Sequence, residues 1–441
     1  MIKNPLRPYP RHVNTKPLLI TNARLFDPES GFDQLGGLLV ENGRIAQIGD
    51  GVSRETFSSE SDVIDAKGCL LSPGLIDARV HLSEPGAEYK EPISETTAAA
   101  AAGGITSLAG LPNTQPVIDD TSILQYIARR AREAKMCKVY AYGAITKGMD
   151  GQEMCEIGLM QEAGAVGFSD GNQAIADAKV MMRALSYSQL FDSAIHSFPS
   201  YPGLGDGDMN SGWLATRLGL SGINPLAEVM LVERDLRLLE TAGGRLHFGP
   251  VTTAKALAAI RKAKDEGLNV TCSTCPHYFT LTETVVGAYR TFGKVYPPLR
   301  SDADRDAVEA AIADGTIDLV VSDHRPQDSD SKRLPFAQAE PGIVGIETLL
   351  PLTLKLYHSG LLDLKTCLGL LTHKPADLLG IPAGRLKLGA AADLTLIDLN
   401  LAHVIKASDL TSRCKNLAFE TMPSQGKAIL TIVDGRIVHQ V

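Results

Sequence analysis

The chain has 441 residues, which is too long for one small core and fits two or three domains, or one barrel with a smaller attached domain. Hydrophobic residues make up 44% and charged residues 21%, which is ordinary for a soluble globular protein. The formal net charge of -8 disfavours non-specific binding to nucleic acid. No apolar run reaches the ~18 residues that span a membrane. The seven scattered cysteines argue for a reducing compartment, so we expect a cytoplasmic protein without disulfides.

The two ends of the chain carry the same kind of strand pattern. Residues 1–17 are basic and proline-rich and have no apolar stretch, which predicts a flexible arm and not a secretory signal. Short alternating strands broken by turn signals follow at 18–28, 36–49 and 61–74 and return at 389–400 and 428–441. We therefore predict a small β-sandwich domain formed from residues 18–72 and 385–441, with residues 73–384 inserted as a larger domain.

The middle of the chain alternates strand and helix patterns. Eight apolar, β-rich runs occur at 75–82, 105–112, 138–145, 165–170, 193–198, 245–251, 269–276 and 317–324. Most of the segments between them carry apolar residues at i, i+3, i+4 and i+7, which is typical of helices. Eight such units predict an α/β fold, a (β/α)8 TIM barrel, whose functional side chains stand at the carboxyl ends of the strands.

Several motifs at these strand ends resemble those of one known family. They are PGLIDARVHLSEPG (73–86), LPNTQP (111–116), YPPLR (296–300), SDHRPQ (322–327) and EPGIVGIETLLP (340–351). In this order they are similar to the motifs of dihydroorotases and related cyclic amidohydrolases, and the likeness covers nearly the whole chain. The resemblance implies a barrel hydrolase that makes or opens the dihydroorotate ring in pyrimidine synthesis.

The resemblance also implies a metal centre of one or two divalent cations that activate water. Its ligands come from an H-x-H pair on the first strand, a carboxylate or carboxylated lysine on the fourth, histidines on the fifth and sixth, and an aspartate on the eighth. His81 and Asp323 match two of these metal positions, and Asp323 also matches the catalytic group that moves the proton. His196 on the fifth strand is a further candidate metal ligand.

Three positions of this metal set have lost their ligand atoms. Arg79 stands where the first histidine of H-x-H is expected, and a guanidinium has no lone pair to donate. Gly171 occupies the position on the fourth strand unless the register slips by one, and Pro250 occupies the position on the sixth. An ungapped alignment places Phe198 at the ligand position of the fifth strand. Since catalytic zinc usually has three protein ligands, we expect no cofactor, or zinc if the site has been rebuilt.

The substrate-binding positions have changed as well. Asn113 keeps a substrate-binding position of the family, but Ser83 replaces the arginine that clamps the substrate carboxylate. Tyr296 replaces the asparagine of N-P-P, and Gln327 the last histidine of D-H-A-P-H. Metal and substrate positions have thus been lost together, which favours a loss of catalysis.

Without a metal ion, a buried Asp323 needs another positive partner. We hypothesise that Arg79 replaces the cation and pairs with Asp323; the alternative is that Arg79 points elsewhere. His81 is then a hydrogen-bonded core residue and Asp323 a structural one.

Three functions are consistent with this pattern. The first is a non-catalytic subunit that supports assembly of aspartate carbamoyltransferase, because some bacteria carry dihydroorotase-like proteins without metal ligands in that role; such a subunit would form homo-oligomers. The second is an active dihydroorotase, or a related cyclic amidohydrolase, that interconverts N-carbamoyl-L-aspartate and dihydroorotate with an altered metal site. The third is a ligand-sensing barrel without an enzyme partner.

Overall fold

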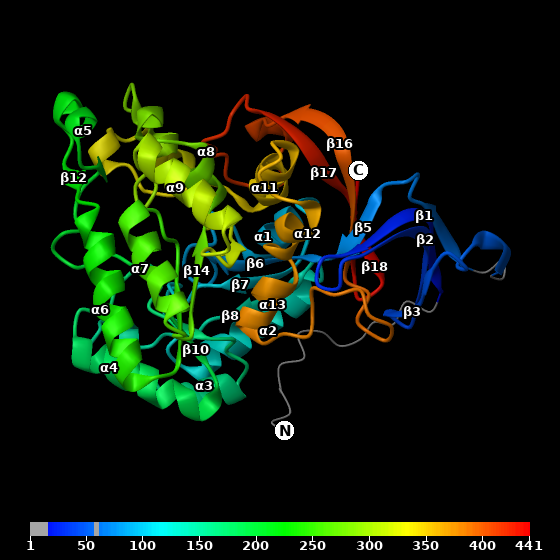
Figure 1. Cartoon of the computed structure of the whole chain (residues 1–441), viewed down its shortest axis with the longest axis horizontal. Helices are drawn as coiled ribbons and strands as arrows, with labels where there is room; N and C mark the ends of the chain where they lie inside the picture. The colour runs from blue at the N-terminus through cyan, green and yellow to red at the C-terminus, as the bar shows by residue number, and fades with distance from the viewer. Residues whose placement is uncertain (1–15, 57–60) are drawn as a thin grey trace.

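The computed structural model describes residues 16–56 and 61–441 of the chain. Nearly all of the predicted arm, residues 1–17, lies outside the described residues. Figure 1 shows two parts, a larger one in which helices surround strands and a smaller one made of strands from both ends of the chain.

The larger part is a closed eight-stranded barrel, as the alternating pattern predicts. Its strands are β6 (Leu75–Val80), β7 (Ile105–Gly110), β8 (Lys138–Ala141), β9 (Phe168–Ser169), β10 (Ala194–Ser197), β13 (Arg245–Phe248), β14 (Val270–Thr274) and β15 (Leu319–Val320). They pair in parallel as β6-β7-β8 and as β9-β10-β13-β14-β15. Bridges from Gly143 to Phe168 and from Val80 to His324 close the ring. The first and eighth strands are therefore neighbours, which brings their carboxyl ends together.

Most helices cover the outside of this ring, as α4, α6 and α7 do in Figure 1. The helices are α1 (Ile93–Ala102), α2 (Thr121–Ala134), α3 (Ile157–Glu162), α4 (Ala178–Ser188), α5 (Trp213–Leu218), α6 (Leu226–Ala242), α7 (Ala254–Asp265), α8 (Pro276–Thr280), α9 (Asp302–Ala313), α10 (Ser329–Arg333), α11 (Leu349–His358), α12 (Leu364–Gly369) and α13 (His373–Leu379). Several begin at a side-chain cap: Asp120, Asp177 and Ser301 each accept a bond from a backbone N–H of the first turn.

Two short strands, β11 (Met209–Asn210) and β12 (Gly222–Ile223), pair in the long connection between β10 and α6. Short 3-10 helices occur at η1 (Arg54–Thr56), η2 (Lys147–Met149), η3 (Gln189–Phe191), η4 (Glu283–Val286), η5 (Thr291–Gly293), η6 (Phe336–Gln338), η7 (Ile346–Thr348) and η8 (Ala407–Asp409). The sequence pattern predicts neither the small sheet nor α5. Strands of two residues and a helix of six are too short to show a periodic pattern.

The smaller part joins both ends of the chain in one sheet. Its strands are β1 (Leu18–Asp27), β2 (Phe32–Glu41), β3 (Arg44–Gly49), β4 (Asp62–Asp65), β5 (Leu70–Pro73), β16 (Leu394–Val404), β17 (Pro423–Val433) and β18 (Arg436–Gln440). The order is β18-β17-β16-β5-β1-β2-β3, with β4 beside β1, and β5 pairs antiparallel with β16. The strands make one continuous sheet, whereas the predicted sandwich consists of two, and the exact domain boundaries stay a prediction.

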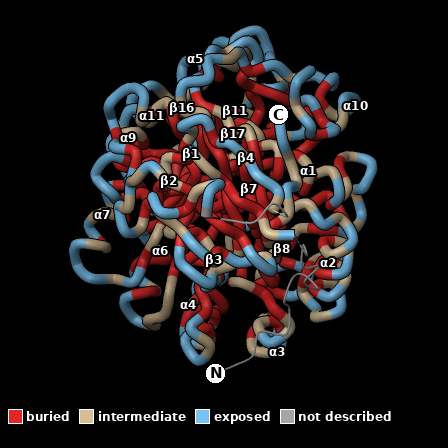
Figure 2. Tube along the Cα trace, turned by 90° about the vertical axis from the view of Figure 1, so that its right-hand side faces the viewer, coloured by how far each residue is buried: buried red, intermediate tan, exposed pale blue. Residues whose placement is uncertain are grey.

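Burial follows these layers. Figure 2 shows buried residues gathered in the interior and exposed ones on the outer turns and helix faces. All seven cysteines are free thiols, in agreement with the expectation of no disulfides. Across residues 16–56 and 61–441, no helix has the length and apolar content that a membrane crossing requires.

Candidate functional site

A buried cluster of charged and polar side chains lies at the junction of the first and last barrel strands. Arg79 lies in β6 and His81 follows it, and residues two apart on a strand point to the same side. Asp323 follows β15, next to the bridge that closes the ring. The Nε of Arg79 donates to Oδ1 of Asp323 at 2.7 Å. Arg79, His81 and Asp323 are each only 4–6% exposed. The predicted ion pair is therefore present.

Two more groups fix the guanidinium in place. Its Nη2 donates to Oδ1 of Asn172, and its central carbon lies 5.6 Å from the ring centroid of Phe198. Burial alone would raise the pKa of Asp323, but the charge of Arg79 and the hydrogen bond from His81 hold that pKa well below its usual range. The pair is thus a charged Arg79 against a charged Asp323 in a nearly dry environment.

His81 is bonded through both of its ring nitrogens. Its Nε2 lies 3.2 Å from Oδ1 of Asp323, and its Nδ1 lies 3.0 Å from Nδ2 of Asn113. Burial lowers the pKa of His81 to about 4, so the ring is neutral at physiological pH. The amide of Asn113 donates to Nδ1, which leaves the proton on Nε2 for Asp323. Neither nitrogen therefore keeps a lone pair free for a metal ion.

The opposite side of the barrel centre carries neutral histidines. His196 packs between Tyr142 and His247, with ring centroids 4.5 and 4.8 Å away. Its Nε2 is buried and has no hydrogen-bond partner among the described residues, and burial lowers its pKa to about 3. His247 is bonded to the hydroxyls of Thr271 and Ser273 at 2.9 and 3.0 Å. The structure thus places His196 beside His247 and Tyr142, and no hydrogen bond joins it to His81 or Asp323.

The residues present do not fit the family's metal ion. Gly171 and Pro250 offer no ligand atom, and a side chain at Gly171, whose φ is +65°, would meet Asn113 at 3.1 Å. Arg79 holds the only carboxylate that the retained ligand set provides. A cation would have to displace this guanidinium and compete with its charge.

One other group of potential ligands lies beside the pair. Cys275, His277 and Asp323 place ligand atoms within 4.8 Å of one another, and all three are buried. Burial raises the pKa of the Cys275 thiol well above its usual range, and the carboxylate is already neutralised by Arg79. A cation that binds here would have to displace the proton of the thiol and compete with Arg79 for the carboxylate.

At two positions where the resemblance implies substrate contacts, the side chains are bonded to neighbouring residues. The ring of Tyr296 lies 5.3 Å from that of Phe198, and its hydroxyl is 2.7 Å from Oγ of Ser200. Gln327 accepts from Lys90 and donates to the carbonyl of Pro341. The positions that the resemblance assigns to substrate binding therefore carry side chains that are bonded to, or packed against, neighbouring residues.

Sequence reasoning missed two of the groups that build this centre. Asn172 directly follows Gly171, but nothing in the sequence around it indicates that its amide would reach Arg79. Glu91 lies in the loop after β6 and accepts from Nε2 of His324 at 2.8 Å, and both side chains are fully buried. An acidic residue at the end of a loop is a weak signal, since most such residues are solvated.

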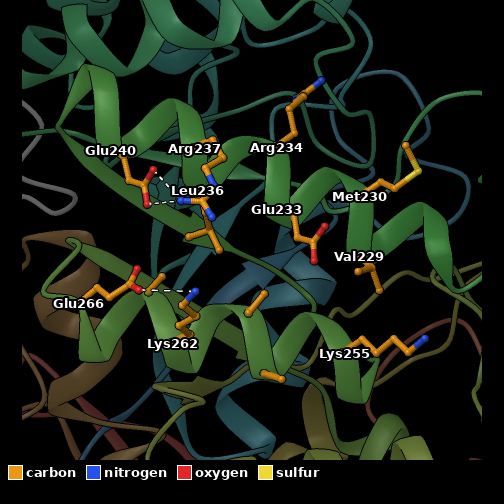
Figure 3. A pocket seen from close by; sticks show the side chains of 13 residues that line it. Val229, Met230, Glu233, Arg234, Leu236, Arg237, Glu240, Lys255, Lys262 and Glu266 are labelled. Carbon is orange, nitrogen blue, oxygen red and sulfur yellow. Dashed lines mark hydrogen bonds and ion pairs between the residues drawn. The ribbon is translucent and has the colours of Figure 1, made fainter.

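The outer wall of the barrel offers a groove of a different kind. It lies between α6 and α7, has a volume of about 790 Å³ and is drawn in Figure 3. Exposed ion pairs lie along its edges. Arg237 is 2.7 Å from Glu240 on α6, and Lys262 of α7 is 3.6 Å from Glu266. The groove contains none of the residues at the carboxyl ends of the strands, so it carries no part of this site.

Comparison with known proteins agrees with this architecture. A family described as Dihydro-orotase-like matches residues 68–256, and the amidohydrolase family matches residues 239–438. A protein named dihydroorotase from Syntrophotalea carbinolica is 45% identical over 96% of this chain and 99% of its own length. One of the same name from Pelobacter propionicus is 42% identical with the same coverage. The solved L-hydantoinase (dihydropyrimidinase) of Arthrobacter aurescens is 25% identical, with a TM-score of 0.84 over 96% of both chains.

Proposed function

The chain belongs to the dihydroorotase family, and we propose that it is a non-catalytic member in which Arg79 takes the place of the metal ion. One observation carries this proposal: Nε of Arg79 lies 2.7 Å from Oδ1 of Asp323, the one carboxylate of the implied ligand set that the chain retains. The guanidinium supplies the positive charge that a buried carboxylate needs, but it has no vacant orbital to polarise water.

The packing around the pair supports the same proposal. Phe198 and Tyr296 stand where the resemblance implies a metal ligand and a substrate-binding asparagine, and their rings lie against each other. Phe198 is 1% exposed, so it adds to the apolar barrel core. The space beside Arg79, His196 and His247 has a volume of only about 10 Å³, which is too small for a substrate.

A folded barrel without chemistry retains its surface. We propose that this chain is a cytoplasmic scaffold that assembles with aspartate carbamoyltransferase and forms homo-oligomers. The proposal rests on the resemblance to metal-deficient dihydroorotase-like proteins and on the filled barrel centre. Loss of function in the pocket leaves the outer helices unaffected, because they form a separate layer of the fold.

A second candidate function is catalysis of the interconversion of N-carbamoyl-L-aspartate and dihydroorotate. The relatives at 42–45% identity over nearly the whole chain are named dihydroorotase, and their names favour this candidate over the first. It requires a rebuilt metal site, and Cys275, His277 and Asp323 are a described group that places three ligand atoms within 4.8 Å of one another.

Metal content and turnover, measured together, separate the two candidates. The purified full-length chain is analysed for bound zinc and assayed in both directions with added zinc, with the Syntrophotalea carbinolica relative as a parallel control. No zinc and no turnover, with an active control, support the first candidate. Stoichiometric zinc with turnover overturns it. Co-expression with the carbamoyltransferase and size-exclusion chromatography then test the scaffold: a shared peak supports it, and separate peaks contradict it.

A further inference from the structure

A second cavity lies at the same end of the barrel, away from Arg79 and Asp323. It has a volume of about 290 Å³ and is bounded by the loop after β6, the segment around α10 and residues 413–416. Its walls carry four basic side chains, from Lys90, Lys332, Arg413 and Lys415, and one acidic side chain, from Asp328. This balance is opposite to that of the whole chain, whose formal net charge is -8.

The three lysines of this cavity have no carboxylate partner among the described residues. Lys90 donates to the amide oxygen of Gln327 at 2.8 Å. Lys332 donates to the backbone carbonyl of Thr291 at 3.0 Å, and Lys415 to that of Leu410 at 2.6 Å. These neutral acceptors position the ammonium groups and leave their charge uncompensated. Arg413, by contrast, is paired with Glu95.

The pKa of Lys332 reflects the positive charge that surrounds this cavity. Burial, together with the charges of Arg325 and Lys294, lowers the pKa of Lys332 to about 7. Burial of an ammonium without a counter-ion is costly, and an anion in the cavity would offset that cost. Lys332 is buried, Lys90 half-buried and Lys415 exposed, and together the three ammonium groups match a doubly charged anion better than a single carboxylate does.

Aromatic rings form the remaining walls. Tyr89 is 66% exposed and Phe292 36% exposed, and both line the cavity. Exposed aromatic faces beside cations are the usual means of holding a planar base together with its phosphate. The volume of about 290 Å³ lies at the lower end of the range for small-ligand sites, which excludes a dinucleotide.

We propose that this cavity binds a nucleoside monophosphate, with the phosphate held by Lys90, Lys332 and Lys415 and the base against Tyr89 and Phe292. A phosphomonoester carries close to two negative charges at neutral pH and three strong acceptor oxygens, which matches three ammonium donors. The site is independent of the function proposed for the barrel centre, since it shares neither Arg79 nor Asp323.

Titration calorimetry on the full-length protein tests this site. The probes are UMP and AMP, with uridine, ribose 5-phosphate and inorganic phosphate as partial ligands. We expect a nucleotide Kd below about 1 mM that weakens with salt, and weaker binding of every partial ligand. Absence of nucleotide binding overturns the proposal. Equal binding of inorganic phosphate overturns the role of the aromatic rings, and with it the proposed ligand class.

Variants locate the binding. Lys90→Gln and Lys415→Gln should each weaken UMP binding by about tenfold, because each removes a charge-assisted hydrogen bond. Phe292→Leu should weaken UMP but not inorganic phosphate. Lys365→Gln changes an exposed lysine of α12 and should leave binding unaltered. Thermal melts establish that each variant is folded. If the two cavity lysine variants bind as tightly as Lys365→Gln, the proposed location is wrong.

Discussion

The two sides of the barrel centre differ in how their buried polar side chains are stabilised. Beside β6 and β15, a negative charge remains at Asp323, and it is answered by Arg79 at 2.7 Å and by His81 at 3.2 Å. Beside β10 and β13, no charge remains, and His196 stays neutral between two rings without a partner for its Nε2. A buried charge must be neutralised, whereas a buried neutral imidazole tolerates isolation at a smaller cost.

The largest expected effect comes from removing the cation on the charged side. Arg79→Met leaves Asp323 buried and unpaired and should lower the free energy of unfolding by about 3–5 kcal/mol, measured by urea denaturation at pH 7.5. Arg79→Met combined with Asp323→Leu should recover most of this loss, because neither charge is then buried. A single variant as stable as the parent would show that the ion pair does not hold this side together.

Acid should weaken the protein through its buried histidines. The folded-state pKa of His196 is about 3, and those of His81 and His277 are about 4, all below the ordinary value of 6.5. The unfolded chain therefore binds more protons below pH 6.5, so stability falls as pH decreases from 6.5 towards 4. Each histidine contributes up to about 1.4 kcal/mol per pH unit. Asp77, whose pKa is raised to about 6, opposes the trend between pH 4 and 6.

His196→Phe separates the neutral side from the charged one. At pH 7.5 this variant should change the unfolding free energy by less than about 1.5 kcal/mol, because an uncharged phenyl ring replaces an uncharged imidazole ring. Between pH 6.5 and 4 its stability should fall less steeply than that of the parent. The difference in slope should equal the contribution of one buried histidine. Denaturant titrations at several pH values measure both quantities. An unchanged slope would mean that His196 is protonated in the folded state.

The smallest effect is expected at the groove between α6 and α7. Arg237 bonds to Glu240 at 2.7 Å, the same separation as in the buried pair, but 71% of its side chain is exposed. Arg237→Ala should therefore leave the unfolding free energy unchanged within the precision of the measurement. A loss comparable to that of Arg79→Met, in the same urea titration, would contradict the role assigned to burial.

The barrel was predictable because each strand leaves an apolar run with turn signals around it. The pairing of Arg79 with Asp323 was also predictable, since closure of a barrel makes the first and eighth strands neighbours. The bond to Asn172 and the contact between Phe198 and Tyr296 were not, because they depend on the paths of loops that carry no periodic pattern. The same limit applies to the terminal sheet, where strand runs do not reveal whether one layer or two will form.

The sheet that unites both ends of the chain also sets a condition on biosynthesis. Pro73 of β5 pairs with Leu394 of β16, so β5 lacks this neighbour until β16 has been synthesised. Until then, the edge of β5 is an unpaired strand open to other chains on the ribosome. A prematurely terminated product that contains the whole barrel but lacks β16 would expose this edge permanently. Translation must therefore pass Val404, the last residue of β16, before this edge of β5 is paired.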